Sequence, residues 1–176
     1  MLLAWFTALA VPGTGAEPLE LVQLEVLNTD QGLLIDFDTR FELPNGVEDA
    51  LQKGVALHFV AEAVVLKERW YWRDRRVAQA TRTWRVAYQP LTFSYRVNFG
   101  GLGQTYPTLG EALRTIQRST SWRVADPIAP NDDGKYRVEF SYRLDRDQLP
   151  RPLQIGVGNA PEWNLQVERT VPVSAR

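Results

Sequence analysis

The sequence predicts an α+β protein rich in β-structure, either an antiparallel sheet or a β-sandwich with two short helices. Apolar and polar residues alternate over most of the chain, which is the pattern of strands with one buried face. Two segments depart from this alternation and have helical spacing instead. The strands also come in runs rather than in regular alternation with helices, so a parallel doubly wound sheet is not expected.

The first strands are expected over residues 19–27 and 32–41, each with an apolar face. The segment between them, Asn28-Thr29-Asp30-Gln31-Gly32, consists of turn formers, so the two strands are predicted to form a hairpin. Residues 55–66 follow as a long run in which every odd position is apolar. Because its even positions are partly apolar too, this strand is predicted to lie centrally in the sheet.

Two helices interrupt the strands. The first is expected to begin at Asn45, an N-cap type followed by Glu48 at the third helical position, and to end at Gly54. The second follows Thr108, and Glu111 completes the same capping pattern there. Its apolar residues then recur at i, i+3, i+4 and i+7, which predicts one buried helix face.

The remaining strands are predicted from the same alternation and from the turns that separate them. These turns are Gln89-Pro90, a Pro- and Asp-rich loop over residues 126–134, and a turn over residues 145–152. The predicted strands are residues 77–89, 91–99, 122–125, 136–144, 153–157 and 164–171.

Residues 1–16 are predicted to be a signal peptide or an N-terminal apolar leader, and residues 17–176 a single β-rich domain. Thr14 and Ala16 stand at the two positions that a signal peptidase recognises. No Lys or Arg precedes the apolar run, so cleavage stays open, and a buried N-terminal helix or strand is the alternative. We therefore expect export to the periplasm or cell envelope. The chain has no cysteine, which excludes disulfides and thiolate chemistry.

The charge is unevenly distributed, although the net charge is only −1. Residues 17–66 carry ten Asp or Glu against two Lys or Arg. Residues 67–123 carry eleven Lys or Arg, ten of them Arg, against three acidic residues. This basic segment is the region in which we expect an anionic partner to bind.

The basic segment opens with guanidinium groups interleaved with aromatic rings. Arginine can fork onto a carboxylate or phosphate while the rings supply apolar contact, so the mixture suits an anionic partner. The alternative is structural: Trp rings fill the core, while Arg stems cover its edge and pair with the acidic first third. The candidate binding residues are Arg69, Trp70, Tyr71, Trp72, Arg73, Arg75, Arg76, Arg82 and Trp84.

Catalytic patterns are sparse. The single histidine, His58, lies in a predicted core strand and is more typical of a structural histidine than of a general base. No Gly-x-Ser-x-Gly turn exists to present a nucleophile. Asp36, Asp38 and Glu62 could supply an acid and a base, so an envelope enzyme that uses carboxylates is the alternative function. No catalytic residue is assigned.

Two loops have compositions that occur in ligand sites. Asp126 and Asn131 to Asp133 could hold Ca²⁺, but their spacing is not that of an EF-hand, and a solvated turn is favoured. Gly100 to Gly103 precedes a helix but lacks the Gly-Lys-Ser/Thr ending of a phosphate loop, so a tight turn or bulge is favoured. We expect no metal and no cofactor. Nucleic acid is not an expected partner, because the isoelectric point is about 5.9 and no nucleic-acid motif is present.

A succession of motifs extends over about residues 19–172. Its segments are Gly54–Val60, Arg69–Trp72, Arg82–Tyr88, Thr108–Leu113, Trp122–Asp126, Gln148–Gln154 and Trp163–Leu165. In this succession the chain resembles the bacterial domain-of-unknown-function family numbered 4390. The resemblance implies an exported or envelope-associated protein of proteobacteria, commonly encoded near a membrane sensor histidine kinase. It implies no activity, cofactor or catalytic residue.

Together these observations favour a non-enzymatic binding or accessory module. We expect it to dock an anionic partner, either a membrane sensor kinase or the anionic envelope surface, through its Arg- and Trp-rich segment. The oligomeric state stays open.

Overall fold

The computed structural model describes residues 19–71, 73–157 and 160–173. Short 3-10 helices lie at Arg146–Gln148 and Pro161–Trp163. The strands are β1 (Leu19–Thr29), β2 (Gly32–Phe41), β3 (Leu57–Lys67), β4 (Arg75–Gln89), β5 (Ser94–Phe99), β6 (Leu102–Tyr106), β7 (Arg118–Ala125), β8 (Tyr136–Leu144) and β9 (Gln166–Pro172). The α-helices are α1 (Asn45–Gln52), α2 (Leu109–Gln117) and α3 (Arg151–Val157).

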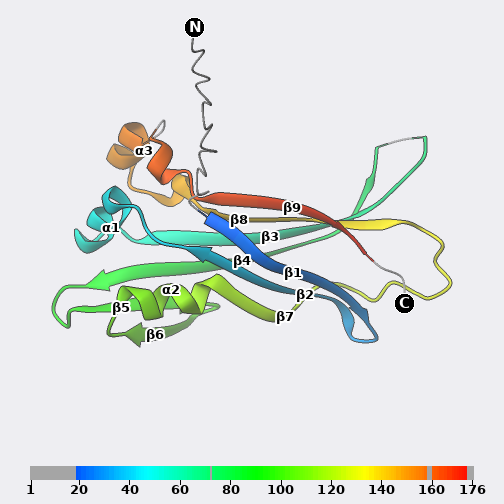
Figure 1. The fold of residues 1–176 in the computed structure, drawn as a ribbon, viewed down its shortest axis with the longest axis horizontal. Coiled ribbons are helices and arrows are strands. Elements are labelled where there is room, and N and C mark those ends of the chain that lie inside the picture. The colour runs from blue at the N-terminus through cyan, green and yellow to red at the C-terminus, as the bar shows by residue number, and fades with distance from the viewer. Residues whose placement is uncertain (1–18, 72, 158–159, 174–176) are drawn as a thin grey trace, which may run out of the picture.

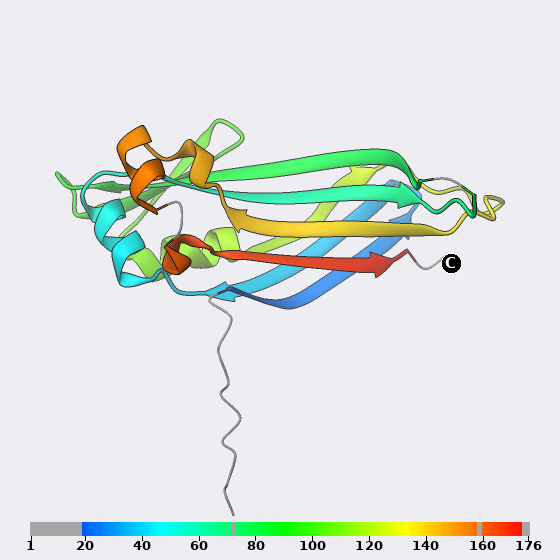
Figure 2. The same ribbon diagram turned by 90° about the horizontal axis from the view of Figure 1, so that it is seen from above.

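The strands form two antiparallel sheets that lie in two layers (Figure 1 and Figure 2). The small sheet has the order β1-β2-β7, and the large sheet has the order β6-β5-β4-β3-β8-β9. Strand β3 is central in the large sheet, as predicted, and pairs with β4 on one side and β8 on the other. The predicted fold class, β-rich α+β with antiparallel sheets, is confirmed.

The hydrophobic core fills the space between the two sheets. Phe37 of β2 is its centre, with the rings of Trp84 and Trp122 both 6.3 Å away between centroids and that of Phe140 at 5.0 Å. These rings come from both sheets, and each is almost fully buried. Edge-to-face and tilted aromatic pairs of this kind add stability beyond the area that they bury.

Helix α2 is tied to both sheets by hydrogen bonds at its C-terminal turn. The fully buried Tyr142 hydroxyl of β8 donates to the carbonyl of Ile116 at 3.0 Å. The Gln117 amide donates to the carbonyl of Phe41 on β2 at 2.7 Å. At the other end, the Thr108 hydroxyl accepts from the backbone N–H of Glu111, which confirms the predicted N-cap.

The two ends of the sandwich differ in kind (Figure 1). We call one the helix end, because α1, α2 and α3 gather there beside the β5–β6 hairpin. We call the other the loop end. It carries the β1–β2 turn, the β3–β4 loop (residues 68–74) and the β7–β8 loop (residues 126–135).

One predicted strand is wrong: residues 153–157 belong to helix α3, so three α-helices are present where two were expected. A strand would place Leu153, Ile155 and Val157 on one face. In the helix, Leu153 and Val157 are four residues apart and share the inner face, whereas Ile155 is 87% exposed. Pro152 at the start of α3 fits the first helical turn, which lacks the N–H bond that proline removes.

The β5–β6 hairpin was not predicted as such. Phe99 and Leu102 pair across a two-residue turn formed by Gly100 and Gly101, with φ values of 54° and 83°. Such turns need positive φ at both positions, which glycine adopts without strain. The glycines therefore form the tight turn that was favoured over a phosphate loop.

The predicted N-cap of α1 is wrong by one residue. Pro44 stands at the N-cap position, so Asn45 is not the cap.

Two of the sequence predictions lie outside the described residues, namely the leader over residues 1–16 and the contribution of Trp72. Within the described ranges, no helix has both the length and the apolarity that crossing a membrane requires.

Candidate functional site

The β3–β4 loop is the tip of a long hairpin. Strands β3 and β4 pair from Leu57 with Val86 to Lys67 with Arg75, with one register shift between Val65 and Leu66, so the loop between them projects from the loop end. Figure 1 shows the ends of β3 and β4 rising away from the β1–β2 turn and the β7–β8 loop at this end. Arg69, Trp70 and Tyr71 therefore lie in a hairpin tip.

The described aromatic and arginine side chains of this loop are exposed to solvent. Trp70 is 94% exposed and Tyr71 is 67% exposed, and their rings contact each other edge to face with centroids 5.0 Å apart. A tryptophan this exposed contributes nothing to the core. Four arginines close to these rings in the chain are also exposed: Arg69 and Arg73 in the loop, and Arg75 and Arg76 at the start of β4. Among the described residues, none of the four forms an ion pair.

The acidic residues of the same loop are engaged by one arginine from β8. The Arg137 guanidinium forms ion pairs with Asp74 and, at 3.9 Å, with Glu68. Its hydrogen bond to Glu139, and then the charge of Asp74, raise the pKa of Arg137. Asp74 also accepts from the backbone N–H of Arg69. Glu68 and Asp74 are thus paired with Arg137 and not with the four exposed arginines. The same ion pairs hold the base of the loop against β8.

A second ion pair joins the last residue of β3 to the β7–β8 loop. Lys67 donates to both oxygens of Asp132, at 2.8 and 2.9 Å, and the same carboxylate accepts from the Tyr136 hydroxyl and the Gly134 N–H. These hydrogen bonds, that of Lys67 first, lower the pKa of Asp132 to about 2. The bond to Asp132 raises the pKa of Lys67 in turn. A backbone bond from Glu68 N–H to the Lys135 carbonyl, 2.9 Å long, runs alongside.

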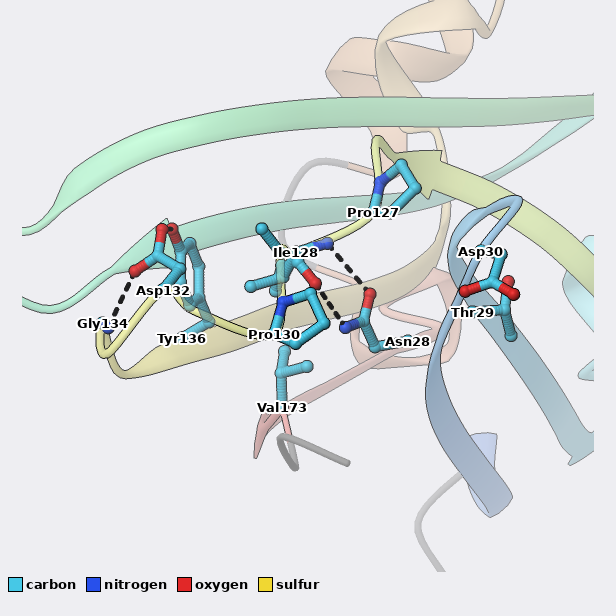
Figure 3. A pocket seen from close by; sticks show the side chains of 11 residues that line it. Asn28, Thr29, Asp30, Pro127, Ile128, Pro130, Asp132, Gly134, Tyr136 and Val173 are labelled. Atoms are coloured by element: carbon cyan, nitrogen blue, oxygen red, sulfur yellow. Dashed lines mark hydrogen bonds between the residues drawn. The ribbon is translucent and has the colours of Figure 1, made fainter.

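A pocket of about 300 Å³ lies beside this ion pair at the loop end (Figure 3). The β1–β2 turn, the β7–β8 loop and Val173 form its walls. The Asn28 side chain closes one wall, because it both accepts from the N–H and donates to the carbonyl of Ile128, as Figure 3 shows. The pocket is thus a structured part of the loop end, and its Asn28, Asp132 and Tyr136 side chains are already bonded within the protein.

Two of the predicted binding residues do not belong to the exposed loop. Arg82 and Trp84 lie on the inner face of β4, and Trp84 is 4% exposed in the core. The two residues share a face, as strand alternation predicts, but this face is covered by β7. Arg82 instead donates to the Ser119 hydroxyl and lies over the rings of Phe99 and Trp122. For these two residues the structural alternative fits better.

Sequence reasoning missed Arg137, Asp74 and the Lys67–Asp132 pair, which hold the loop in place. Arg137 stands opposite Leu66 on the outer face of the large sheet, and a strand pairing of β3 with β8 brings it to the loop base. Only knowledge of that pairing could have indicated the contact, because the partners lie more than 60 residues apart.

The three carboxylates considered for acid–base catalysis are not brought together. Asp36 and Asp38 alternate with the buried residues of β2 and so lie on the outer face of the small sheet. Asp36 accepts from Ser121 N–H, and Asp38 lies 3.8 Å from Arg118. Glu62 alternates with the buried residues of β3 and lies on the opposite outer face, where it is bonded to Gln79 and Arg143. The two sheets separate these groups.

His58 is half-buried on the outer side of β3, and its Nδ1 is buried with no hydrogen-bond partner in the described part of the chain. Burial, and then the charge of Arg85, lower its pKa, while Asp145 opposes this shift. A neutral imidazole with one unused nitrogen is consistent with a structural histidine.

The loop considered for calcium binding contains Asp132, whose oxygens are already bonded to Lys67, Tyr136 and Gly134. Asp126 is instead bonded to Arg123 at 2.8 Å. Across residues 19–71, 73–157 and 160–173, no three His, Asp or Glu side chains converge as metal ligands.

The chain belongs to the family described as Domain of unknown function (DUF4390), whose model matches residues 16–171. No curated protein and no solved structure matches the chain.

Proposed function

We propose that this protein is a non-enzymatic binding module that docks onto an anionic surface through its β3–β4 loop. The observation that carries the proposal is this hairpin tip: the loop and the start of β4 expose two aromatic rings and four arginines, and these arginines form no ion pair with the described carboxylates. Export to the periplasm or cell envelope is part of the proposal, and it rests on the apolar leader over residues 1–16.

Of the anionic partners considered, the observations favour a phospholipid bilayer surface. Tryptophan and tyrosine rings are enriched at membrane–water interfaces, where one part of the ring is apolar and the other is wet. Each arginine near an anionic leaflet contributes about 1 kcal/mol, so four supply up to about 4 kcal/mol. A projecting loop anchored at its base by Arg137 and Lys67 can present these groups together.

The test is sedimentation of the full chain with phosphatidylglycerol vesicles at low and at high salt. We expect binding at low salt, weakening at high salt, and little binding to phosphatidylcholine. Replacing Arg73, Arg75 and Arg76 with Ala should weaken binding roughly a hundredfold, because about 3 kcal/mol of attraction is lost.

The matched control changes three exposed arginines of the helix end. Arg96, Arg114 and Arg151 lie on β5, α2 and α3, and their replacement by Ala changes the net charge equally. This variant should bind the vesicles nearly as well as the wild type. Both variants keep residues 1–16, so the leader contributes equally. Equal weakening in both would show that net charge, not the loop, governs binding. Vesicle-independent capture of a sensor protein that the loop variant loses would replace the membrane with a protein partner.

A further inference from the structure

A groove of about 450 Å³ lies at the helix end, between α2 and the β5–β6 hairpin. It exists because the small sheet has three strands and the large sheet six, so the inner face of β5 and β6 is only partly covered. The volume falls within the range of roughly 300–1,000 Å³ that small-molecule sites occupy. Its walls are mostly apolar, formed by the side chains of Trp84, Val97, Phe99, Leu102 and Tyr106.

The apolar wall remains accessible to solvent. Leu102 is 79% exposed at the mouth of the groove, and Phe99 is also exposed. Trp84 forms the floor and stacks on Phe99 with ring centroids 5.5 Å apart. None of the described residues that line the groove is charged. The groove can therefore receive an apolar body without displacing an ion pair.

A guanidinium stands beside this groove. Arg82 lies over the Phe99 ring at 5.5 Å and over the Trp122 ring at 5.3 Å. It donates a hydrogen bond to the Ser119 hydroxyl, which is a neutral acceptor, and among the described residues no carboxylate pairs with it. Burial lowers the pKa of Arg82, which reflects the cost of removing this charge from water. Arginine carries five N–H donors, so several remain for an anion.

The geometry points to a binding site for a long-chain carboxylate, with the acyl chain in the β5–β6/α2 groove and the carboxylate on Arg82. Arg82 is not itself part of the groove lining, but it contacts the ring of Phe99, which is. An uncharged groove with a half-buried cation against one of its wall residues is complementary to an amphiphile with an anionic head. A carboxylate can take two parallel N–H bonds from the guanidinium fork. This site is separate from the β3–β4 loop and does not depend on its role.

The test is calorimetric titration of the full chain with dodecanoate, kept below its micelle concentration, against dodecyltrimethylammonium, which has the same chain length and the opposite charge. We expect saturable binding of dodecanoate at one site and at least tenfold weaker binding of the cation. Thr115→Trp should fill the groove from α2, where Thr115 is exposed, and should weaken dodecanoate binding at least tenfold.

Two further variants test the role of the positive charge of Arg82. Arg82→Gln should also weaken dodecanoate binding at least tenfold. Because Arg82 contacts the core, Gln104→Glu at the exposed rim serves as a second variant that leaves Arg82 in place, and it should weaken dodecanoate but not the cation. The loop variant with Arg73, Arg75 and Arg76 replaced by Ala should bind dodecanoate as the wild type does.

Three results would overturn the proposal. Equal binding of the anionic and cationic amphiphiles would remove the role of Arg82. Dodecanoate binding that Thr115→Trp leaves unchanged would place the ligand elsewhere. If dodecanoate does not bind and Thr115→Trp instead abolishes self-association, then a second copy of the chain covers the groove.

Discussion

The loop end and the helix end use the same two kinds of side chain, arginine and aromatic rings, in opposite arrangements. At the loop end, the rings of Trp70 and Tyr71 and the arginines around them all project into solvent. At the helix end, the rings line a groove, and the guanidinium of Arg82 against the Phe99 ring is half-buried. The first arrangement suits contact with an extended surface, and the second suits a small ligand. Strand register, rather than composition, decides which of the two a given arginine joins.

The largest expected effect separates the two tryptophans. Trp84→Ala should destabilise the fold by about 3–5 kcal/mol, because it leaves a cavity beside Phe37 in the core. Trp70→Ala should change the free energy of unfolding by no more than about 0.5 kcal/mol, since its ring is in solvent. Urea unfolding of both variants measures the difference. A comparable loss in the two would mean that Trp70 packs within the fold.

A backbone prediction concerns the turn that begins β2 at the loop end. Gly32 has a φ of 136°, and a Cβ there would lie 2.6 Å from the carbonyl oxygen of Ala125. Gly32→Ala should cost about 2–3 kcal/mol, because it adds both backbone strain and a clash with backbone. Thermal unfolding checks this, with Gly110→Ala as the control, since a Cβ at Gly110 meets nothing within 4 Å. Similar stability of the two variants would contradict the described turn.

Substitutions of Arg82 and Arg75 should differ in their effect on stability in the same direction as those of Trp84 and Trp70, but by less. Arg82→Ala removes contacts to two rings and to Ser119 and should destabilise by about 1–2 kcal/mol. Arg75→Ala should change stability by no more than about 0.5 kcal/mol, because its side chain is exposed. Chemical denaturation of both variants measures the difference. An Arg82→Ala variant with an unchanged free energy of unfolding would show that Arg82 is not half-buried as described.

The smallest expected effects are in the pH dependence of folding stability. A group near each end of the sandwich should contribute to it, each in its own pH range. The folded pKa of His58, near the helix end, and that of Asp132, at the loop end, are both lowered, so the unfolded chain binds more protons and acid destabilises the fold. The His58 contribution is present above its ordinary pKa of 6.5 and is lost below that value. The Asp132 contribution is present above 3.8 and is lost as the pH falls through about 2.

Substituting His58 or Asp132 should remove only the pH-dependent contribution to stability that this residue makes. His58→Gln should flatten the change in stability below pH 6.5, and Asp132→Asn should flatten the change between 3.8 and about 2. Melting temperatures recorded across the pH range for both variants provide the measurement. If either variant altered the other's window, the two groups would not act independently.

The β-rich fold could be predicted because alternation along each strand encodes one buried face. The β1–β2 hairpin, the central position of β3 and the Thr108 cap all follow from local pattern. Helix α3 could not be told from a strand, because Leu153, Ile155 and Val157 satisfy both periods until tertiary packing selects Leu153 and Val157. The pairing of residues that are distant in sequence left no local signal.

For the candidate site, too, local pattern predicts some features, while others depend on residues that are distant in sequence. The exposed loop arginines follow from their position in a turn between two strands. That Arg82 and Trp84 share a face also follows from alternation, but which face β7 would cover does not. The anchoring of Asp74 by Arg137 depends on the β3–β8 pairing. The groove depends on the unequal width of the two sheets, which no segment of the chain specifies alone.

The most direct test of the loop as a docking surface is amide hydrogen exchange of the full chain with and without phosphatidylglycerol vesicles. We predict that vesicles slow exchange in the β3–β4 loop and in the adjoining β7–β8 loop, while α2 and the β5–β6 hairpin keep their rates. Slowed exchange confined to α2 and β6, with residues 68–74 unchanged, would contradict the account and assign the membrane contact to the groove end.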